Sequence, residues 1–431
     1  MLKTINWSEL TRVEQQRAIE RPANEQQTTI YTQTTAIIEA VRTHGDAALI
    51  DFTQRFDKVK LEQLKLSSAA IAAAQQQVDA NFLKAMEYAM HNIRVYHQAQ
   101  LPQTLALTTV PGVHCERQAR PIPRVGLYVP GGSAPLISTV MMLAIPALLA
   151  GCPLRILCTP PTPTGEIDPH VVVTAAACGI QDIYKVGGAQ AIAAMAYGTE
   201  TIPKVDKIFG PGNAWVTQAK VLVAQDPKGA SLDLPAGPSE VMIIADKSAN
   251  PAFIAADLLS QAEHGVDSHV LLISTCEHLL SAVNRAVERQ LAVLKRRAIA
   301  KQALEKAVFI KVEDIATAIT ISNEYAPEHL ILNIIDAEHY VADIQCAGAV
   351  FLGPWTPEVV GDYVTGSNHV LPTYGYGRSY SGLSLKDFLT FISFQTVTEE
   401  GLKALAPAAM QLAALEGLTA HEYALKVRLA K

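Results

Sequence analysis

The middle of the chain repeats one short pattern, in which an apolar segment, a turn and a helix-like stretch follow one another. The apolar segments read as short buried strands at 125–129, 155–159, 183–186 and 207–209. Glycine-rich turns follow three of them, at 130–133, 187–188 and 210–212. The repeats have the length of βαβ units, which favours a parallel, doubly wound sheet.

A second α/β region begins at the apolar run 241–245. We expect further strands at 270–273, 330–332 and 350–352. Residues 28–100 show helical periodicity, with a plausible helix stop at His44-Gly45, and a helical tail is expected after Gly382. The polar first 23 residues read as an arm or small cap. The fold class is therefore α/β, in two or three domains.

Composition limits the classes of function. Apolar residues make up 49% of the 431 residues and charged residues 18%, which argues against disorder. A net charge of -6 gives no reason to expect a nucleic acid partner. The longest apolar run, 140–150, contains Pro146 and is too short to span a bilayer, so no membrane association is expected. Six cysteines without a C-x-x-C pair, and an N-terminus without a signal-peptide core, favour the cytoplasm.

The glycine-rich turns suit a bound anion, because such turns expose backbone N–H groups at the start of a helix. None of them is a complete G-x-G-x-x-G, so the dinucleotide fingerprint is absent. Tyr128, Gln190 and Asn213 sit at or next to these turns. They can stack on or hydrogen-bond a nucleotide, but they can equally be cap and core residues.

The segment 250–265 predicts a helix with two polar residues near its end. Asn250 is a good N-cap, Pro251 suits the first turn, and Gly265 is a good stop. Gln261 and His264 are three residues apart and share one face of the last turn. They are plausible metal ligands, although a solvated helix end whose histidine complements the helix dipole explains them as well.

Further polar residues gather in the second half of the chain. Glu328 and His329 place an acid beside a base just before a strand, where they either share a pocket or are an exposed glutamate and a packed histidine. Asp362 and His369 belong to a polar, glycine-punctuated loop that can hold a site. Ser239 either touches a ligand or closes a turn.

The last helix is expected to begin with a capping box at 419–422, with Glu416 just before it. His421 would then lie in a first helical turn, where positive charge is disfavoured and a neutral ligating imidazole is reasonable. A plain surface helix start is the other explanation. Gln261, His264, Asp362 and His421 together would offer two oxygens and two nitrogens, a set that fits zinc. The sequence alone does not show that these four residues meet in space.

Taken together, these segments resemble the histidinol dehydrogenase family. The matching stretches lie between residues 125 and 421 and are VGLYVPGGSAP, KVGGAQAIAA, KIFGPGNAWVT, DLPAGPSEV, DLLSQAEHG, YAPEHL, GDYVTGSNHVLPT and EGLTAH. The resemblance implies an NAD-dependent, four-electron oxidation of L-histidinol to L-histidine through L-histidinaldehyde, the final steps of histidine biosynthesis. It also implies one zinc ion per subunit, which positions the substrate.

The resemblance further assigns roles to residues. It implies Glu328 and His329 as the catalytic acid/base pair, and NAD contacts at Tyr128, Gln190 and Asn213. The implied zinc ligands are Gln261, His264, Asp362 and His421. Substrate contacts are implied at Ser239, Gln261, His264, His329, Asp362, His369, Glu416 and His421.

The resemblance also implies a homodimer of subunits with two incomplete Rossmann-like domains. The expected parts are an arm (1–23), an α/β domain with the metal and acid/base residues (24–128 plus 239–382), a nucleotide-crevice domain (129–238) and a helical tail (383–431). The tail would cross to the partner subunit, although a tail can also fold back on its own chain.

Two other classes of function compete with a dehydrogenase. A zinc hydrolase would use Glu328 to activate a metal-bound water and would work without NAD. A non-catalytic protein would bind metal or an imidazole compound tightly without turnover. The repeated glycine-rich turns favour the dehydrogenase over both.

Overall fold

The structure is a computed structural model that describes residues 3–21, 27–131, 135–235 and 237–430. Pro22 and Ala23 of the expected arm, Gly132 and Ser133 of the first glycine-rich turn, and Ala236 therefore lie outside the described residues. The chain divides into two compact units, one of Met1–Gln100 with Pro123–Phe388 and one of Leu101–Ile122 with Leu389–Lys431. No helix in the described part of the chain has both the length and the apolar character needed to cross a membrane.

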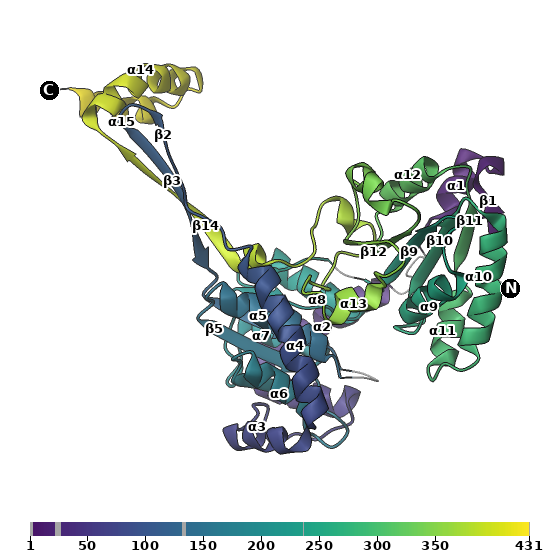
Figure 1. Ribbon diagram of the computed structural model, residues 1–431. Coiled ribbons are helices and arrows are strands. Elements are labelled where there is room, and N and C mark those ends of the chain that lie inside the picture. Colours follow the sequence, from purple (N-terminus) through teal and green to yellow (C-terminus); the bar gives the residue numbers. More distant parts are fainter. Residues whose placement is uncertain (1–2, 22–26, 132–134, 236, 431) are drawn as a thin grey trace. The chain divides into compact units, whose positions relative to one another are not determined.

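The first unit contains a five-stranded parallel sheet in the order β6-β5-β4-β7-β8. Figure 1 labels its strand β5 and the helices around the sheet. Its strands are β4 (Arg124–Tyr128), β5 (Leu154–Thr159), β6 (Asp182–Lys185), β7 (Lys207–Phe209) and β8 (Ser231–Leu232). In chain order this is 3-2-1-4-5, the order of a doubly wound Rossmann sheet without its sixth strand. The predicted parallel, doubly wound sheet is confirmed.

Helices cover both faces of this sheet. One face packs against α2 (Gln27–Phe56), α7 (Gly188–Tyr197) and α8 (Ala214–Gln225), and the other carries α4 (Ala80–Gln98), α5 (Ile137–Leu149) and α6 (Pro169–Ala177). The short helix α3 (Ser68–Ala74) lies against α6. Gly45 interrupts α2 with a φ of 52°, at the helix stop expected from the sequence. With a φ of 52° and a ψ of -129°, Gly45 has a backbone conformation that other residues rarely adopt, and a Cβ there would also displace the Glu200 carboxylate.

A six-stranded parallel sheet, also in the first unit, has the order β1-β11-β10-β9-β12-β13. Its strands are β1 (Thr4–Asn6), β9 (Glu240–Ala245), β10 (His269–Ser274), β11 (Val308–Lys311), β12 (His329–Asn333) and β13 (Ala349–Leu352). Without β1 the order is again 3-2-1-4-5, so the expected second incomplete Rossmann-like domain is confirmed. The N-terminal arm supplies β1 as an added edge strand, which the sequence did not predict.

The six-stranded sheet is also covered on both faces. The helices α9 (Pro251–Ala262), α10 (Glu277–Leu291) and α11 (Arg297–Leu304) pack on one face, and α12 (Ile315–Tyr325) packs on the other. The remaining helices of the unit are α1 (Arg12–Ala18), α13 (Glu358–Tyr363) and the 3-10 helices η1 (Trp7–Glu9), η2 (Gln75–Gln77), η3 (Ala337–Asp343), η4 (Tyr376–Arg378) and η5 (Leu385–Phe388).

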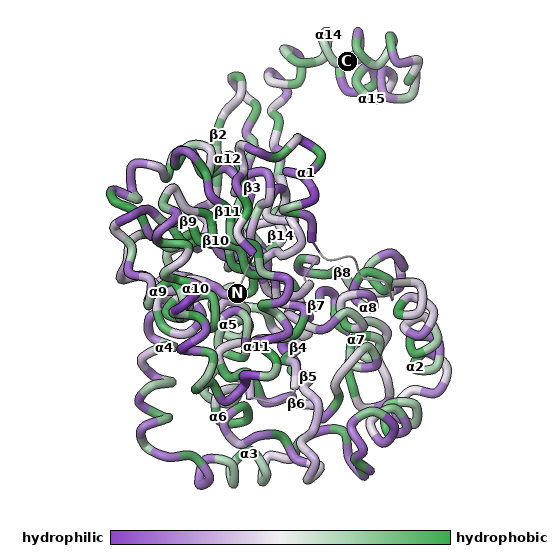
Figure 2. The backbone as a smooth tube through the Cα atoms, turned by 90° about the vertical axis from the view of Figure 1, so that its right-hand side faces the viewer, coloured by the Kyte–Doolittle hydropathy of each residue, from purple (hydrophilic) through white to green (hydrophobic). Residues whose placement is uncertain are grey.

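The second unit joins two distant parts of the chain. Its antiparallel sheet has the order β14-β3-β2, from β2 (Leu105–Val110), β3 (Val113–Pro121) and β14 (Leu389–Val397). The expected helical tail is present as α14 (Glu399–Leu415) and α15 (Thr419–Leu429), and β14 precedes it as an unpredicted strand. Hydrophobic and hydrophilic residues alternate along both helices (Figure 2). Large apolar side chains of the unit are exposed, among them Leu412, Leu415 and Tyr423.

Candidate active site

The polar residues of the six-stranded sheet gather at the amino ends of β9 and β12. These are the adjacent central strands, where the strand order reverses, and His329 is aligned with Val241. Ligands of open α/β sheets usually lie at the carboxyl ends of the strands instead. Here the C-terminal ends of α9 and α12 deliver residues to the amino ends. The partial negative charge of a helix C-terminus favours a cation there.

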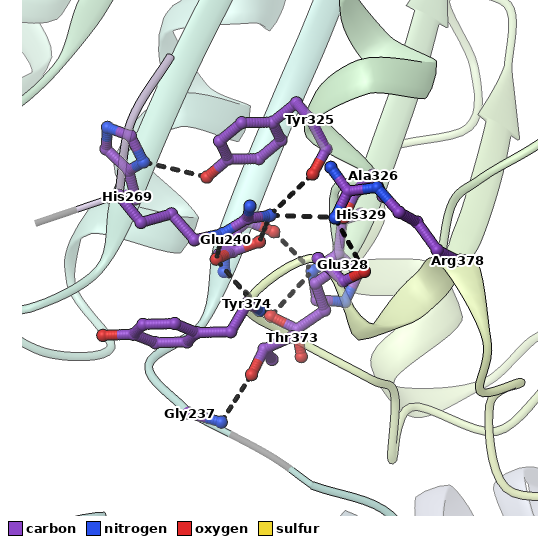
Figure 3. Close-up of polar contacts among 12 residues, drawn as sticks. Gly237, Glu240, His269, Tyr325, Ala326, Glu328, His329, Thr373, Tyr374 and Arg378 are labelled. Atoms are coloured by element: carbon purple, nitrogen blue, oxygen red, sulfur yellow. Dashed lines mark hydrogen bonds and ion pairs between the residues drawn. The ribbon is translucent and has the colours of Figure 1, made fainter. Parts of the chain in front are cut away.

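Glu328 and His329 lie side by side and are both buried (Figure 3). The Glu328 carboxylate accepts a hydrogen bond from the Glu240 backbone N–H at 2.8 Å, and His329 Nδ1 donates to the Glu240 carbonyl at 3.0 Å. His329 Nδ1 is 3.6 Å from Glu328 Oε2. His329 Nε2 has no hydrogen-bond partner among the described residues, although it lies 3.8 Å from Asp362 Oδ1. Its lone pair is thus available to a ligand.

Burial shifts the pKa values of this acid/base pair in opposite directions. Desolvation, with the nearby Glu240 and Asp362 carboxylates, raises the pKa of Glu328 well above its usual range. Desolvation lowers the pKa of His329 to about 3. At neutral pH the imidazole is therefore uncharged and able to accept a proton, and a carboxylate with a raised pKa is a stronger base.

Helix α13 supplies two more carboxyl groups, of which Glu358 is buried and Asp362 is partly buried. Glu358 and Asp362 are four residues apart, so they lie on one face of this short helix. The sequence placed Asp362 in a loop, which is wrong, because the helix runs through Tyr363 and the loop begins after it. Glu358 Oε1 is 3.8 Å from His329 Nδ1. Burial raises the pKa of Asp362 to about 6, and burial beside Asp362 and Glu328 raises the pKa of Glu358 well above its usual range.

Three of these residues form a group able to hold a metal ion. Ligand atoms of His264, Glu358 and Asp362 all lie within 4.8 Å of one another. Helix α9 begins as expected, with the Asn250 side chain capping Pro251–Ala262, but it ends before His264, which occupies the following turn. The His264 N–H donates to the Gln261 carbonyl at 3.2 Å, so the turn keeps both residues together.

The side chain of Gln261 is 0% exposed, yet neither its amide oxygen nor its amide nitrogen has a hydrogen-bond partner in the part of the chain that the structure describes. A buried amide without partners is rare and destabilising. Asp257, one turn earlier on α9, is also buried, and burial raises the pKa of its carboxyl to about 7. The site thus combines an unpaired amide with an excess of buried carboxyl groups. Both features fit a divalent cation, and the imidazole, carboxylate and amide donors suit zinc.

His369 and Ser239 lie beside this group. His369 is partly buried, its Nδ1 is 3.9 Å from Asp362 Oδ1, and its Nε2 is 3.4 Å from the Thr139 hydroxyl of α5. Burial lowers the pKa of His369 to about 4. Ser239 precedes β9, and its carbonyl accepts a hydrogen bond from the His269 N–H. Thr139 belongs to α5, the helix that follows β4, so a helix that covers the five-stranded sheet contacts this site.

The glycine-rich turns of the five-stranded sheet lie at the carboxyl ends of its strands, as expected. The Tyr128 hydroxyl accepts a hydrogen bond from the Gly188 N–H at 2.9 Å, and the Asn213 side chain caps α8. Tyr128 and Gln190 are buried, whereas Asn213 is exposed. Tyr128 and Asn213 thus have structural roles, and of the three residues Tyr128, Gln190 and Asn213 only Asn213 is exposed.

Glu416 and His421 belong to the second unit. Glu416 ends α14 as its C-cap, and His421 lies in the first turn of α15, as expected. The predicted capping box at 419–422 is wrong. Leu418 is the N-cap, and no side chain caps the helix, because Thr419 is already its first residue.

Sequence reasoning missed three contributors to the site, namely Glu358, Glu240 and Arg21. A pattern points to Glu358, since Pro357 followed by two acids four residues apart is typical of a short helix with one acidic face. Glu240 is the one charged residue in an otherwise apolar strand. Nothing near Arg21 in the sequence connects it to a site more than two hundred residues away.

Comparison with known proteins gives one consistent match. The model of the histidinol dehydrogenase family matches residues 20–429. The histidinol dehydrogenase of Vibrio parahaemolyticus is 49% identical over 430 residues, covering 100% of this chain and 99% of the relative. That of Legionella pneumophila is 50% identical with the same coverage. The crystal structure of histidinol dehydrogenase from Elizabethkingia anophelis aligns with a TM-score of 0.94 at 47% identity, covering 99% of this chain and 98% of that one.

Proposed function

This chain belongs to the histidinol dehydrogenase family, and from that premise we propose how its residues carry out the reaction. It is an oxidoreductase of histidine biosynthesis that acts on histidinol. We propose that it removes four electrons, converting L-histidinol through L-histidinaldehyde to L-histidine. Two NAD molecules would accept the two hydrides in turn.

One zinc ion per subunit is the proposed metal, held by Gln261, His264, Asp362 and His421. The observation that carries this proposal is the buried Gln261 amide without partners, next to the grouped ligand atoms of His264 and Asp362. When bound, zinc would hold the imidazole and amine of the substrate and so fix the carbinol in place. Such positioning can contribute on the order of 7–11 kcal/mol at its limit.

His329 is the proposed base of the first oxidation. Its Nδ1 donates to the Glu240 carbonyl, so the proton resides on Nδ1 and Nε2 offers its lone pair. Nε2 would take the hydroxyl proton as hydride leaves the carbinol carbon. Glu328 would then take a proton from water as the water adds to the aldehyde, giving the hydrate. In the same step protonated His329 would return its proton to the aldehyde oxygen, which completes the hydrate and leaves His329 neutral. His329 would then take the hydrate's proton as the second hydride leaves.

The remaining predicted residues contact substrate or cofactor in this proposal. Ser239, His369 and Glu416 would bind histidinol, and Tyr128, Gln190 and Asn213 would bind NAD. The nucleotide turns lie in the five-stranded sheet and the reacting groups in the six-stranded sheet. The expected domains are 129–238 and 24–128 with 239–382, but β4, α2 and α4 of the range 24–128 pack with the five-stranded sheet. The contact between His369 and Thr139 of α5 brings a helix of the five-stranded sheet to the site, which supports binding NAD next to the substrate there.

We propose that the protein is a homodimer whose tails are exchanged, so that Glu416 and His421 complete the site of the partner subunit. The exposed apolar side chains of the second unit support an interface there. Six free cysteines support work in the reducing cytoplasm.

The decisive experiment follows NADH absorbance from limiting L-histidinol, with zinc-loaded and chelator-stripped protein. Two NADH per histidinol, lost on stripping and restored by zinc, are expected. Glu328→Gln should form one NADH and release aldehyde, because hydration then lacks its base. If Glu328→Gln instead blocked the first oxidation and left hydration of added aldehyde intact, the assignment of Glu328 would be wrong.

A further inference from the structure

Glu240 holds both reacting residues through its backbone. Its N–H donates to Glu328 Oε2 at 2.8 Å, and its carbonyl accepts from His329 Nδ1 at 3.0 Å. A carbonyl can only accept, so this bond fixes the imidazole tautomer and directs the Nε2 lone pair into the site. Small shifts of the first residue of β9 would therefore move both groups at once.

The side chain of Glu240 is fixed by Arg21 of the N-terminal arm. The Glu240 carboxylate is 2% exposed, and Arg21 binds it with two parallel bonds, Nε to Oε1 at 2.5 Å and an Nη2 donor to Oε2 at 2.8 Å. Bidentate pairs of this kind impose a geometry as well as a charge match. The Tyr374 N–H adds a third donor to the carboxylate at 3.2 Å (Figure 3).

Arg21 also holds the segment that leads into Glu328. Its guanidinium stacks on the Tyr325 ring, 3.8 Å from the centroid, and donates to the carbonyls of Tyr325 and Ala326 at 3.0 and 3.3 Å. Ala326 is the left-handed C-cap of α12, with a φ of 53°, and only Pro327 separates it from Glu328. The Tyr325 hydroxyl contacts His269 Nδ1 at 2.8 Å, which fixes the ring from its far side.

We propose that Arg21 and Glu240 form a positioning pair for this reaction, in which the N-terminal arm locks together the starts of β9 and β12 and so aims Glu328 and His329 at the substrate. Neither side chain touches the substrate in this arrangement. The inference rests on the proposed roles of Glu328 and His329. It adds Arg21 and the N-terminal arm to the residues that position these two side chains.

The test compares Arg21→Lys with Arg17→Lys, a matched change at an exposed arginine of the same arm. Lysine keeps the charge but cannot make the bidentate or stacked contacts. For Arg21→Lys we expect kcat to fall about 10- to 100-fold, because displacements near 1 Å cost that much, while KM for histidinol changes less than about threefold. Zinc affinity, measured by equilibrium dialysis, should stay unchanged. Arg17→Lys should match the wild type throughout.

A second variant guards against misfolding. Removing one partner of a buried pair leaves an uncompensated charge, so the double change Arg21→Gln with Glu240→Gln, which is neutral, is made as well. It should fold, retain zinc and release trappable aldehyde, since hydration depends on the position of Glu328. Wild-type kcat in either folded variant would overturn the proposal. Equal losses of kcat, histidinol binding and zinc affinity would also overturn the proposal, and so would failure of both variants to fold. Either result would show that the pair of Arg21 and Glu240 has a purely structural role. A wild-type protein that forms no NADH from histidinol would instead refute the proposed function.

Discussion

Replacing Gln261 with leucine should change the stability of the protein in opposite directions with and without zinc. Both amide atoms of Gln261 are buried without a partner in the metal-free site. Leucine removes those atoms at a similar volume. The metal-free variant is therefore expected to be more stable than the wild type, and the zinc-loaded variant less stable.

The magnitude follows from the unpaired amide. A buried donor or acceptor left unsatisfied costs about 1–3 kcal/mol, so removing it should stabilise the metal-free protein by roughly 2 kcal/mol. With an unfolding entropy of about 2.1 cal/mol/K per residue, this corresponds to a rise in Tm of about 2 °C. Zinc at about 100 times its Kd stabilises a protein by about 2.7 kcal/mol. The variant should lose most of that gain, because one ligand is missing.

Differential scanning calorimetry of stripped and zinc-loaded protein measures both effects. Asn368→Leu is the matched control, since the buried Asn368 amide donates to the Met142 carbonyl and accepts from the Val370 N–H. Asn368→Leu should lower the Tm of the metal-free protein. The reasoning fails if Gln261→Leu also lowers it, or if zinc stabilises Gln261→Leu as much as the wild type.

Two further outcomes are expected. His269 is buried, and desolvation next to Arg21 lowers the pKa of its imidazole to about 4, below the value near 6.5 of the unfolded chain. Unfolding therefore takes up a proton below pH 6.5, and stability should fall by roughly 3 kcal/mol as the pH drops from 6.5 to 4. Thermal melts across this pH range should show that the Tm of His269→Gln falls less steeply with decreasing pH than the Tm of the wild type. An equally steep fall in both proteins would contradict the lowered pKa of His269. Glu358→Gln removes one of several buried, mutually repelling carboxyl groups, so the metal-free protein should melt higher while zinc is retained less well in equilibrium dialysis. Unchanged zinc retention would exclude Glu358 from the metal group.

Most strands of the two parallel sheets were predictable because they are short apolar runs bounded by glycine and proline. Every strand expected between 125 and 352 is present within a residue or two. The prediction missed β8, which has only two residues, and β11, although β11 is a short apolar run. It also missed β1, a three-residue edge strand, and β14, which is exposed along most of its length and pairs with β3 from a distant part of the chain. Local periodicity cannot reveal a partner that lies elsewhere in the chain.

At the site, too, the sequence indicated which residues have the right chemistry but not where they lie in the fold. The motifs identified Gln261, His264, Asp362, Glu328 and His329 as residues with the right chemistry, and the structure brings them to one end of the six-stranded sheet. The sequence could not indicate that this would be the amino end, because that depends on the loops after α9 and α12. The roles of these residues, like those of Glu416 and His421, stay predictions.

The antiparallel sheet of the second unit has a consequence for folding during synthesis. β2 and β3 leave the ribosome early, yet their third strand begins only at Leu389. At about 5–20 residues per second, the hairpin waits for roughly ten to fifty seconds with an open edge. A two-stranded hairpin is marginal by itself, and an unpaired strand edge invites pairing with other chains. The edge that waits is that of β3, and Leu105 and Leu107 of β2 add exposed apolar side chains to the same hairpin, so this segment is where a chaperone would protect the nascent protein.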